Sequence, residues 1–308
     1  MAQETLPASP LVRATVLLVR GASGEPEYGT NFQTQSDAWQ TTASTAGAEL
    51  LMLGGGSPGG TREEADHSRL EKILTDMPKE GPAPLWIVLI GHGTWDGKEA
   101  RFNLEGPDLS GSELAAWLRP VKRPLTLINT SSSSGPFISL LAGPGRTVIT
   151  ATRSGSERNY ARYGDYLAQA LTDPAADYDQ DGSVSVLEWF LRASSLTVAF
   201  YQADGRLLTE HALIDDNGDG KATPADWFRG LRATSKAKDG TPVDGSTAQR
   251  IFLKPDTAAQ QMTPVQLALR DDLEAKVNSL RQTKSSLPEA DYYHQLEDLL
   301  RQLAELYP

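Results

Sequence analysis

Cysteine is absent from the 308-residue chain. Disulfide bonds, thiolate metal sites and a thiol nucleophile are therefore excluded for the chain as given. Any nucleophilic chemistry would have to use another side chain.

Basic residues and long apolar runs are also scarce. The chain has 29 Lys and Arg against 40 Asp and Glu, a formal net charge of −11, and the basic residues form no stripe. Nucleic acid and anionic membranes are therefore poor candidate partners. No apolar run approaches the roughly 18 residues of a membrane span, and the first ten residues lack the apolar core of a signal peptide. The sequence therefore predicts no nucleic-acid partner, no membrane span and no signal peptide in this chain.

Short apolar, β-branched runs alternate with amphipathic stretches. The runs predict strands at 15–20, 49–53, 85–90, 124–129 and 146–150. The amphipathic stretches predict helices at 31–46, 62–77 and 186–201. A further helix is expected to begin at Ser110, where Glu113 three residues later completes a capping box. This alternation favours a largely parallel sheet that binds ligands beyond the carboxyl ends of its strands, so the loops after Ile90 and Asn129 are the candidate sites.

Two polar segments occupy those loops. His92 lies between two glycines after the run 85–90, and serines 131–134 follow the run 124–129 after Thr130. A lone histidine is more often structural than catalytic, and a serine run is more often a solvated loop. Neighbouring strand ends could bring both together, however, and flanking glycines allow the close approach that a general base and a nucleophile require.

The order of these motifs resembles the legumain family of cysteine peptidases, within the wider caspase-like group. That family has a His-Gly pair after one strand and a Cys-x-Ser-Gly run after the next, which here read His92-Gly93 and residues 132–135. Further motif positions are matched by Phe102, Asp108, Leu109, Ala151, Thr152, Glu157, Tyr160, Ala161, Tyr163 and Asp165. The resemblance covers residues 15–171 and implies a caspase-like fold. It also implies His92 as general base, Ser132 at the nucleophile position and Gly93 at the oxyanion site.

Three departures from the family pattern affect the expected chemistry. Ser132 replaces the cysteine, the neutral Thr130 stands where legumains have a glutamate, and their basic residues near the first strand have no clear match. Asparaginyl specificity is therefore not expected. By analogy, Thr130 and Asp165 are the residues expected to line the substrate pocket.

Two segments fit the twelve-residue calcium loop. In that loop, oxygens at positions 1, 3 and 5 and a carboxylate at position 12 surround the cation, and glycine at position 6 makes a sharp turn. The candidate ligands of the first loop, 177–188, are Asp177, Asp179, Asp181, Ser183 and Glu188. Those of the second loop, 215–226, are Asp215, Asn217, Asp219, Lys221 and Asp226, whose short side chain would need a water to reach the metal. The alternative interpretation of each segment is a simple Asp/Gly turn. The sequence predicts Ca²⁺ as a cofactor that braces the sheet domain, and such sites favour a location outside the cytoplasm.

The predicted fold class is α/β, a caspase-like sandwich with a mostly parallel central sheet. The expected divisions are the peptidase-like domain at 11–171, a calcium-loop helical extension at 172–231, a linker at 232–260 with one strand at 250–253, and a helical hairpin at 261–308. The hairpin helices are expected at 266–283 and 289–306. Their apolar seam, expected to be exposed, consists of Leu273, Val277, Leu280, Leu296, Leu300 and Leu303. Such a seam would allow assembly into a homo- or hetero-oligomer.

The functional hypotheses differ in what they assign to Ser132, which has a hydroxyl where the family has a thiol. A serine needs a well-oriented base backed by a third group, and Asp96, the acidic residue near His92, fits a turn better than that role. The favoured function is a catalytically impaired pseudopeptidase that binds extended peptide or protein partners. Two alternatives stay open. One is an active endopeptidase in which Ser132, or a cysteine replaced there, attacks with His92 as base, and the other is a structural assembly protein that acts through the hairpin.

Overall fold

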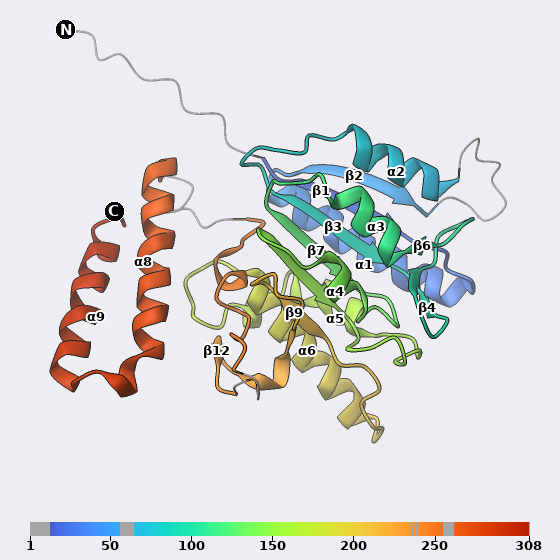
Figure 1. Cartoon of the computed structure of the whole chain (residues 1–308). Coiled ribbons are helices and arrows are strands. Elements are labelled where there is room, and N and C mark those ends of the chain that lie inside the picture. Colours follow the sequence, from blue (N-terminus) through green and yellow to red (C-terminus); the bar gives the residue numbers. More distant parts are fainter. Residues whose placement is uncertain (1–12, 56–64, 236, 238–239, 255–261, 308) are drawn as a thin grey trace, which may run out of the picture.

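A seven-stranded sheet of order β10-β9-β8-β7-β3-β1-β2 forms the centre of the computed structural model, which describes residues 13–55, 65–235, 237, 240–254 and 262–307 (Figure 1). The parallel strands are β1 (Thr15–Arg20), β2 (Glu49–Gly54), β3 (Leu85–Ile90), β7 (Leu125–Asn129) and β8 (Arg146–Thr150). Two short strands, β9 (Leu213–Asp215) and β10 (Thr223–Pro224), extend the sheet in antiparallel orientation. The predicted α/β class with a mostly parallel central sheet is confirmed.

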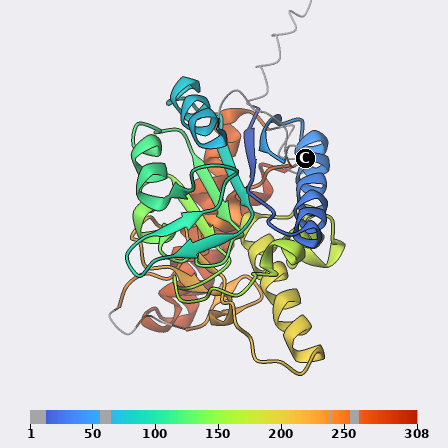
Figure 2. The same ribbon diagram turned by 90° about the vertical axis from the view of Figure 1, so that its right-hand side faces the viewer.

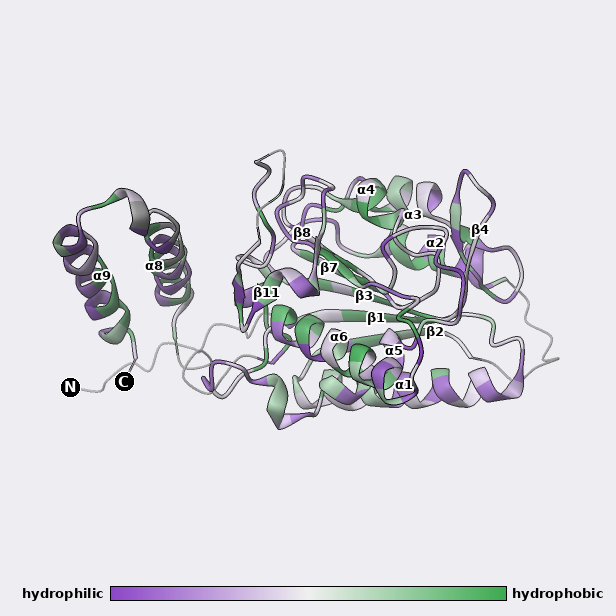
Figure 3. Cartoon of the chain, turned by 90° about the horizontal axis from the view of Figure 1, so that it is seen from below, coloured by the Kyte–Doolittle hydropathy of each residue, from purple (hydrophilic) through white to green (hydrophobic). Residues whose placement is uncertain are grey.

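Helices cover both faces of the sheet, as Figures 2 and 3 show. One face carries α1 (Pro26–Thr45), α5 (Tyr163–Ala170) and α6 (Val186–Ala203), and the other carries α2 (Asp66–Asp76), α3 (Gly111–Leu118) and α4 (Phe137–Leu141). Alternate side chains of a strand point to opposite faces, so Val16 and Leu18 pack in one core and Leu17 and Val19 in the other. Burial on both faces explains why the strands are continuous apolar runs.

The helices begin where local signals place them. The capping box at α3 forms, with the Ser110 hydroxyl accepting from the Glu113 amide and the Glu113 carboxylate accepting from the Ser110 amide. Helix α1 begins five residues before the expected start at 31, because Pro26 supplies a fixed φ that suits the first helical turn. Residues 62–64 of the expected second helix lie outside the described residues. No helix in the described part of the chain is long and apolar enough to cross a membrane.

The sheet continues across the boundary expected between residues 171 and 172. After the short helix η1 (Pro174–Ala176), the first Asp/Gly loop leads into α6, and β9 then pairs with β8 in the register Ile149 to Ile214. Because Ile214 is fully buried, the segment 172–231 completes the main core and is not a separate layer. A three-residue strand carries too short a pattern to be recognised in the sequence.

The described part of the expected linker packs on the core. It follows η2 (Ala225–Trp227) and the small sheet of β11 (Phe228–Arg229) and β12 (Arg232–Ala233). The strand expected at 250–253 does not form, because η3 (Ala248–Arg250) ends there and the Ile251 carbonyl accepts from the Val186 amide instead. Asp244, Ala248 and Leu253 are buried. Part of the expected linker therefore packs on the core.

Helices α8 (Pro264–Gln282) and α9 (Glu289–Ala304), joined through η4 (Lys284–Ser286), form the hairpin at one side of the molecule (Figure 1). The α8 part of the seam differs from the expectation, because Leu273, Val277 and Leu280 are buried. On α9, Leu300 is exposed, while Leu296 and Leu303 are half-buried.

Candidate functional site

The loops after β3 and β7 meet at Gly93 and Ser132. These strands are neighbours, and the Thr130 amide donates to the Leu89 carbonyl at 3.0 Å. The Ser132 hydroxyl donates to the Gly93 carbonyl at 3.1 Å, and the Gly93 amide lies 3.4 Å from the same hydroxyl. A Cβ at Gly93 would come within 2.2 Å of the Ser132 carbonyl oxygen, so a larger residue would push the two segments apart.

The His92 ring is oriented by a backbone carbonyl. Its Nε2 lies 3.2 Å from the Ser23 oxygen, in the loop that follows β1. Because a carbonyl can only accept, Nε2 must carry the hydrogen, which leaves Nδ1 as the basic nitrogen of the neutral ring. The sequence could not show this contact, because it uses the Ser23 backbone and no side chain.

Three aromatic rings enclose His92. The ring centroids of Tyr28, Phe32 and Tyr160 lie 4.7, 5.1 and 5.9 Å from the centroid of the imidazole. Burial lowers the pKa of His92, and the contact with the Ser23 carbonyl opposes this only in part. The ring is therefore held in the neutral form, which can accept a proton but stabilises no neighbouring anion.

The Ser132 hydroxyl is not engaged with that base. Within the described residues, no hydrogen bond joins His92 to Ser132, and the serine is only 5% exposed. A serine nucleophile needs its proton directed at a base. The resting arrangement directs it at the Gly93 carbonyl instead.

The turn that carries Ser132 is strained and firmly held. Ser133 has φ of 55°, a left-handed conformation that is rare for a residue with a Cβ. Its amide donates to the Glu157 carbonyl at 2.8 Å, while its hydroxyl is buried without a hydrogen-bond partner. On one side, Asn129 accepts from the Ser131 amide, and on the other, Thr152 accepts from the Gly135 amide. Such strain persists only where the surroundings impose it, which is typical of functional sites.

Of the two residues expected to bind substrate, Thr130 is buried and Asp165 is half-buried. The Thr130 hydroxyl donates to the Leu89 carbonyl, and Asp165 accepts from the Gln35 amide at 2.7 Å and from the Tyr160 hydroxyl at 3.1 Å. Burial raises the pKa of Asp165, although these hydrogen bonds oppose it. Asp165 therefore fixes Tyr160 beside His92.

A cleft of ≈ 360 Å³ adjoins the aromatic rings around His92. It is lined by Glu27, Tyr28, Asn31, Asn159, Tyr160, Arg162, Tyr201, Arg206, Leu207 and Thr209. The guanidinium groups of Arg162 and Arg206 lie 4.4 and 5.4 Å from the centroid of the Phe200 ring. The sequence did not indicate these arginines, because they are distant in the chain. Arg162 lies just before α5 and Arg206 just after α6.

Asp96 forms the turn that its sequence context indicates. In the small sheet of β4 (Gly93–Trp95), β5 (Ala100–Phe102) and β6 (Leu109–Ser110), its carboxylate accepts from the amides of Lys98 and Glu99, both at 2.9 Å. The hydrogen bond from the Glu99 amide, the ion pair with Arg101 and the hydrogen bond from the Lys98 amide hold the pKa of Asp96 well below its usual range. It makes no hydrogen bond with His92.

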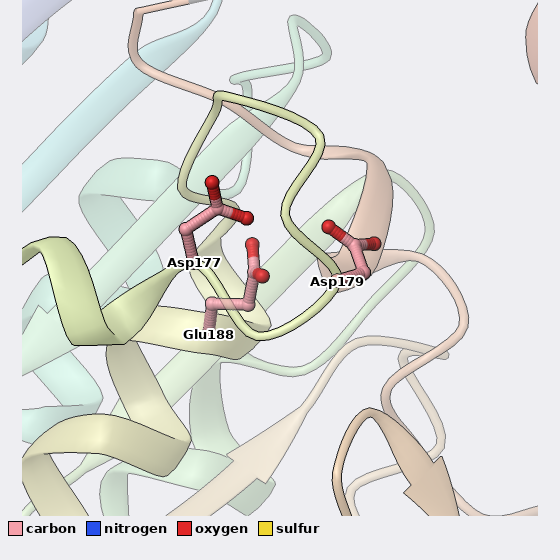
Figure 4. Close-up of side chains that lie close together, drawn as sticks. All are labelled: Asp177, Asp179 and Glu188. Atoms are coloured by element: carbon pink, nitrogen blue, oxygen red, sulfur yellow. The ribbon is translucent and has the colours of Figure 1, made fainter.

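The first Asp/Gly loop brings three carboxylates together (Figure 4). Oxygens of Asp177, Asp179 and Glu188 all lie within 4.8 Å of one another. Burial raises the pKa of both Asp179 and Glu188, and the neighbouring carboxylates add to this. A divalent cation would relieve their mutual repulsion, and hard oxygen donors suit calcium.

Backbone amides fix the remaining groups of this loop. Asp177 accepts from the amides of Asp181 and Gly182 at 3.2 and 3.1 Å, and Asp181 accepts from the Ser183 amide at 2.7 Å. The Ser183 hydroxyl is buried without a hydrogen-bond partner. The residues present therefore fit a calcium ion.

The second loop makes backbone amide contacts similar to those of the first. Asp215 accepts from the amides of Gly218 and Gly220, Asn217 accepts from the Asp219 amide, and the Lys221 ammonium donates to Thr241. Asp226 is exposed on η2, and among the described residues only the first loop gathers three acidic side chains closely enough to hold a metal.

Comparisons with known proteins give a distant likeness. No protein-family model and no curated protein matches the sequence. The Drosophila initiator caspase Dronc is similar with a TM-score of 0.46 and 14% identity, over 70% of this chain and 83% of that chain. Caspase-1 from Spodoptera frugiperda is similar with a TM-score of 0.44 and 12% identity, over 66% of this chain and 86% of that chain. For a Geobacter sulfurreducens protein the TM-score is 0.39 and the identity 12%, over 60% and 89% of the two chains. Two of the three are caspases, the group that the sequence motifs resemble, but at these scores the likeness carries no conclusion about chemistry.

Proposed function

We propose that the chain is a catalytically impaired, peptidase-like protein that binds extended peptide segments of partner proteins beside His92 and Ser132. The observation that carries the proposal is the hydrogen-bond partner of the Ser132 hydroxyl. The Ser132 hydroxyl donates to the Gly93 carbonyl, while the His92 ring contacts Ser23 and three aromatic rings. A hydroxyl without a base to remove its proton is a poor nucleophile, so binding without turnover is expected.

The surroundings of residue 132 favour a peptide ligand. The loops after β1, β3 and β7 converge at this end of the sheet, where open α/β sheets bind ligands. The adjoining cleft offers guanidinium, amide and hydroxyl groups together with tyrosine rings. These groups suit the polar backbone and side chains of an extended peptide.

Replacing the nucleophile tests this proposal. We expect Ser132→Cys to cleave members of a peptide library varied at the residue before the scissile bond, because a thiol needs less help from a third group than a hydroxyl. The unmodified protein should bind such peptides, measured by fluorescence anisotropy, without cleaving them. The double variant Ser132→Cys, His92→Ala should lose the activity, since it lacks the base.

Two outcomes would contradict the proposal. If the unmodified protein cleaves peptides and Ser132→Ala abolishes this, the serine is a true nucleophile and the chain is an endopeptidase. If neither form binds any library member, the site is not a peptide site, and assembly through the hairpin becomes the better hypothesis.

Calcium is proposed as a stabilising cofactor of the first loop. Asp177, Asp179 and Glu188 would hold the ion, with Asp181 and Ser183 completing the loop. The ion would supply charge neutralisation at the N-terminus of α6, distant in the chain from His92. No catalytic step is assigned to it.

A further inference from the structure

We infer that Glu157 and His211 form a clamp that holds the turn after Ser132 in its left-handed conformation and thereby positions residue 132. This inference deepens the proposed function and rests on it, because residue 132 is taken as the point where ligand and nucleophile position meet. Neither residue touches Ser132, so both are positioning residues.

The turn needs such a clamp because two features of Ser133, its backbone conformation and its buried hydroxyl, cost free energy. Its φ of 55° places the Cβ close to the following carbonyl oxygen, and its hydroxyl is buried without a partner. Free of restraint, the residue would relax to a negative φ and rotate the neighbouring Ser132. The conformation therefore depends on contacts from outside the turn.

The direct contact is the hydrogen bond from the Ser133 amide to the Glu157 carbonyl, at 2.8 Å. The Glu157 side chain is itself fixed on both oxygens. Oε2 accepts from the amides of Arg153 and His211 at 3.0 and 3.1 Å, and Oε1 lies 2.6 Å from His211 Nδ1 and 3.1 Å from Arg153 Nε. Only 11% of this side chain is exposed. Four contacts thus hold the residue whose carbonyl restrains Ser133.

The clamp also connects the turn to the cleft. His211 follows Glu210, whose carboxylate accepts from the amides of Arg162 and Tyr163 at 2.9 Å. Arg162 and the nearby Thr209 both line the cleft. A ligand that shifts this wall would therefore act on Ser133 through His211 and Glu157.

The experiment uses Ser132→Cys as a reporter, because its thiol reactivity can be measured without any peptidase activity. The rate of alkylation by iodoacetamide is followed across the pH range in which thiols ionise. We expect Glu157→Gln and, separately, His211→Asn to lower the limiting rate at high pH by about tenfold, the scale set by the strain of one left-handed residue. Adding Ser133→Gly to Glu157→Gln should restore the rate, since glycine adopts positive φ without strain.

The matched control is Arg192→Gln, which breaks a part-buried ion pair with Asp173 that shares no hydrogen bond with the clamp. It should lower the melting temperature without changing the alkylation rate. If Glu157→Gln behaves like this control, or if Ser133→Gly gives no rescue, the clamp is overturned. Should Glu157→Gln fail to fold, His211→Asn and its combination with Ser133→Gly decide in the same way. If alkylation responds as expected while Ser132→Cys neither binds nor cleaves peptides, the clamp stands and the proposed function fails.

Discussion

Asp244 is an acidic side chain that the fold encloses almost completely, with 2% of its surface exposed. It accepts from the Asp216 amide at 2.9 Å and from the Thr223 hydroxyl at 2.7 Å. Burial raises its pKa from 3.8 to about 7, against the effect of these hydrogen bonds and with some repulsion from Asp216. The folded protein therefore holds a proton on Asp244 at pH values where the unfolded chain has lost it.

This difference predicts a pH dependence of stability. A carboxyl whose pKa is higher in the folded state stabilises the protein below the unfolded pKa, and this contribution is lost as pH rises from 3.8 to about 7. In Asp244→Asn the free energy of unfolding should therefore no longer fall as pH rises through this range. The difference from the unmodified protein should be on the order of 2 kcal/mol. Urea unfolding with chelator present, at about pH 5 and about pH 8, measures it.

The control is Asp219→Asn, which removes the same charge at an exposed position. It should leave the difference between the two pH values unchanged. Equal pH dependence in Asp244→Asn and the unmodified protein would show that Asp244 is ionised in the fold throughout.

At the residue scale, the sequence predicted the residues that occur in recognisable motifs. It did not predict a contact made by a backbone carbonyl or the burial of a single aspartate. His92, Gly93 and Ser132 follow strand ends that the apolar runs mark clearly, and the structure brings their segments together. The Ser23 carbonyl carries no side-chain signal. The burial of Asp244 depends on contacts with Asp216 and Thr223, which are distant in sequence, so no local pattern predicts it.

The first calcium loop is the element whose binding is most directly testable. Saturating calcium should raise the melting temperature by about 5 °C, as expected when a ligand binds only the folded state at about 100 times its Kd. Glu188→Gln should abolish the shift, because an amide retains the shape of the side chain but not its charge. Differential scanning calorimetry in chelator and in excess calcium measures it.

The matching change in the second loop is Asp219→Asn, which should preserve the calcium shift because that loop does not gather three carboxylates. If both variants keep the shift, the metal binds elsewhere. Identical melting curves for the unmodified protein with and without calcium would remove the site from the proposal.

The cleft gives a second prediction at the scale of elements. Arg162 lies at the start of α5 and Arg206 just after α6, and both guanidinium groups line the cleft. Peptides with acidic side chains should therefore bind better than neutral ones at low salt. Arg162→Gln should weaken acidic peptides about fivefold, the scale of a partly exposed charge pair, and leave neutral peptides unchanged.

Anisotropy titrations at two salt concentrations measure this, with the exposed Arg229 on β11 as control. Arg229→Gln removes the same charge away from the cleft and should have no effect. If Arg162→Gln lowers the affinity for acidic and neutral peptides equally, the arginine shapes the cleft and does not bind the acidic side chains of the peptide.

Elements differed in how well the sequence revealed them. The five strands expected between residues 15 and 150 all form, because buried parallel strands are continuous apolar runs with clear ends. The three-residue strand β9 was missed, because three residues cannot show a period. The expected strand at 250–253 failed because the Ile251 backbone bonds to the start of α6, a contact distant in sequence.

At the scale of the whole molecule, the hairpin stands apart from the two cores. Among the described residues of the hairpin, no buried side chain belongs to either apolar core of the sheet. Along α9 and just beyond it, Tyr293, Leu300 and Tyr307 recur every seven residues and are 49%, 46% and 41% exposed. Leu296 and Leu303 lie between them at the spacing of a heptad seam. Leu296 and Leu303 are half-buried, so Leu300 is the leucine of this seam that the hairpin leaves exposed.

We therefore expect the chain to self-associate through this seam of α9. Leu300→Glu should shift the protein toward the monomer, because a carboxylate cannot be buried between helices without a partner. Sedimentation velocity at several concentrations measures this, with circular dichroism to confirm that the helices persist. Leu207→Glu is the control, since Leu207 is 88% exposed outside the hairpin and should not alter association. A monomer at every concentration of the unmodified protein, or an equal effect of both variants, would show that the seam serves no contact between copies.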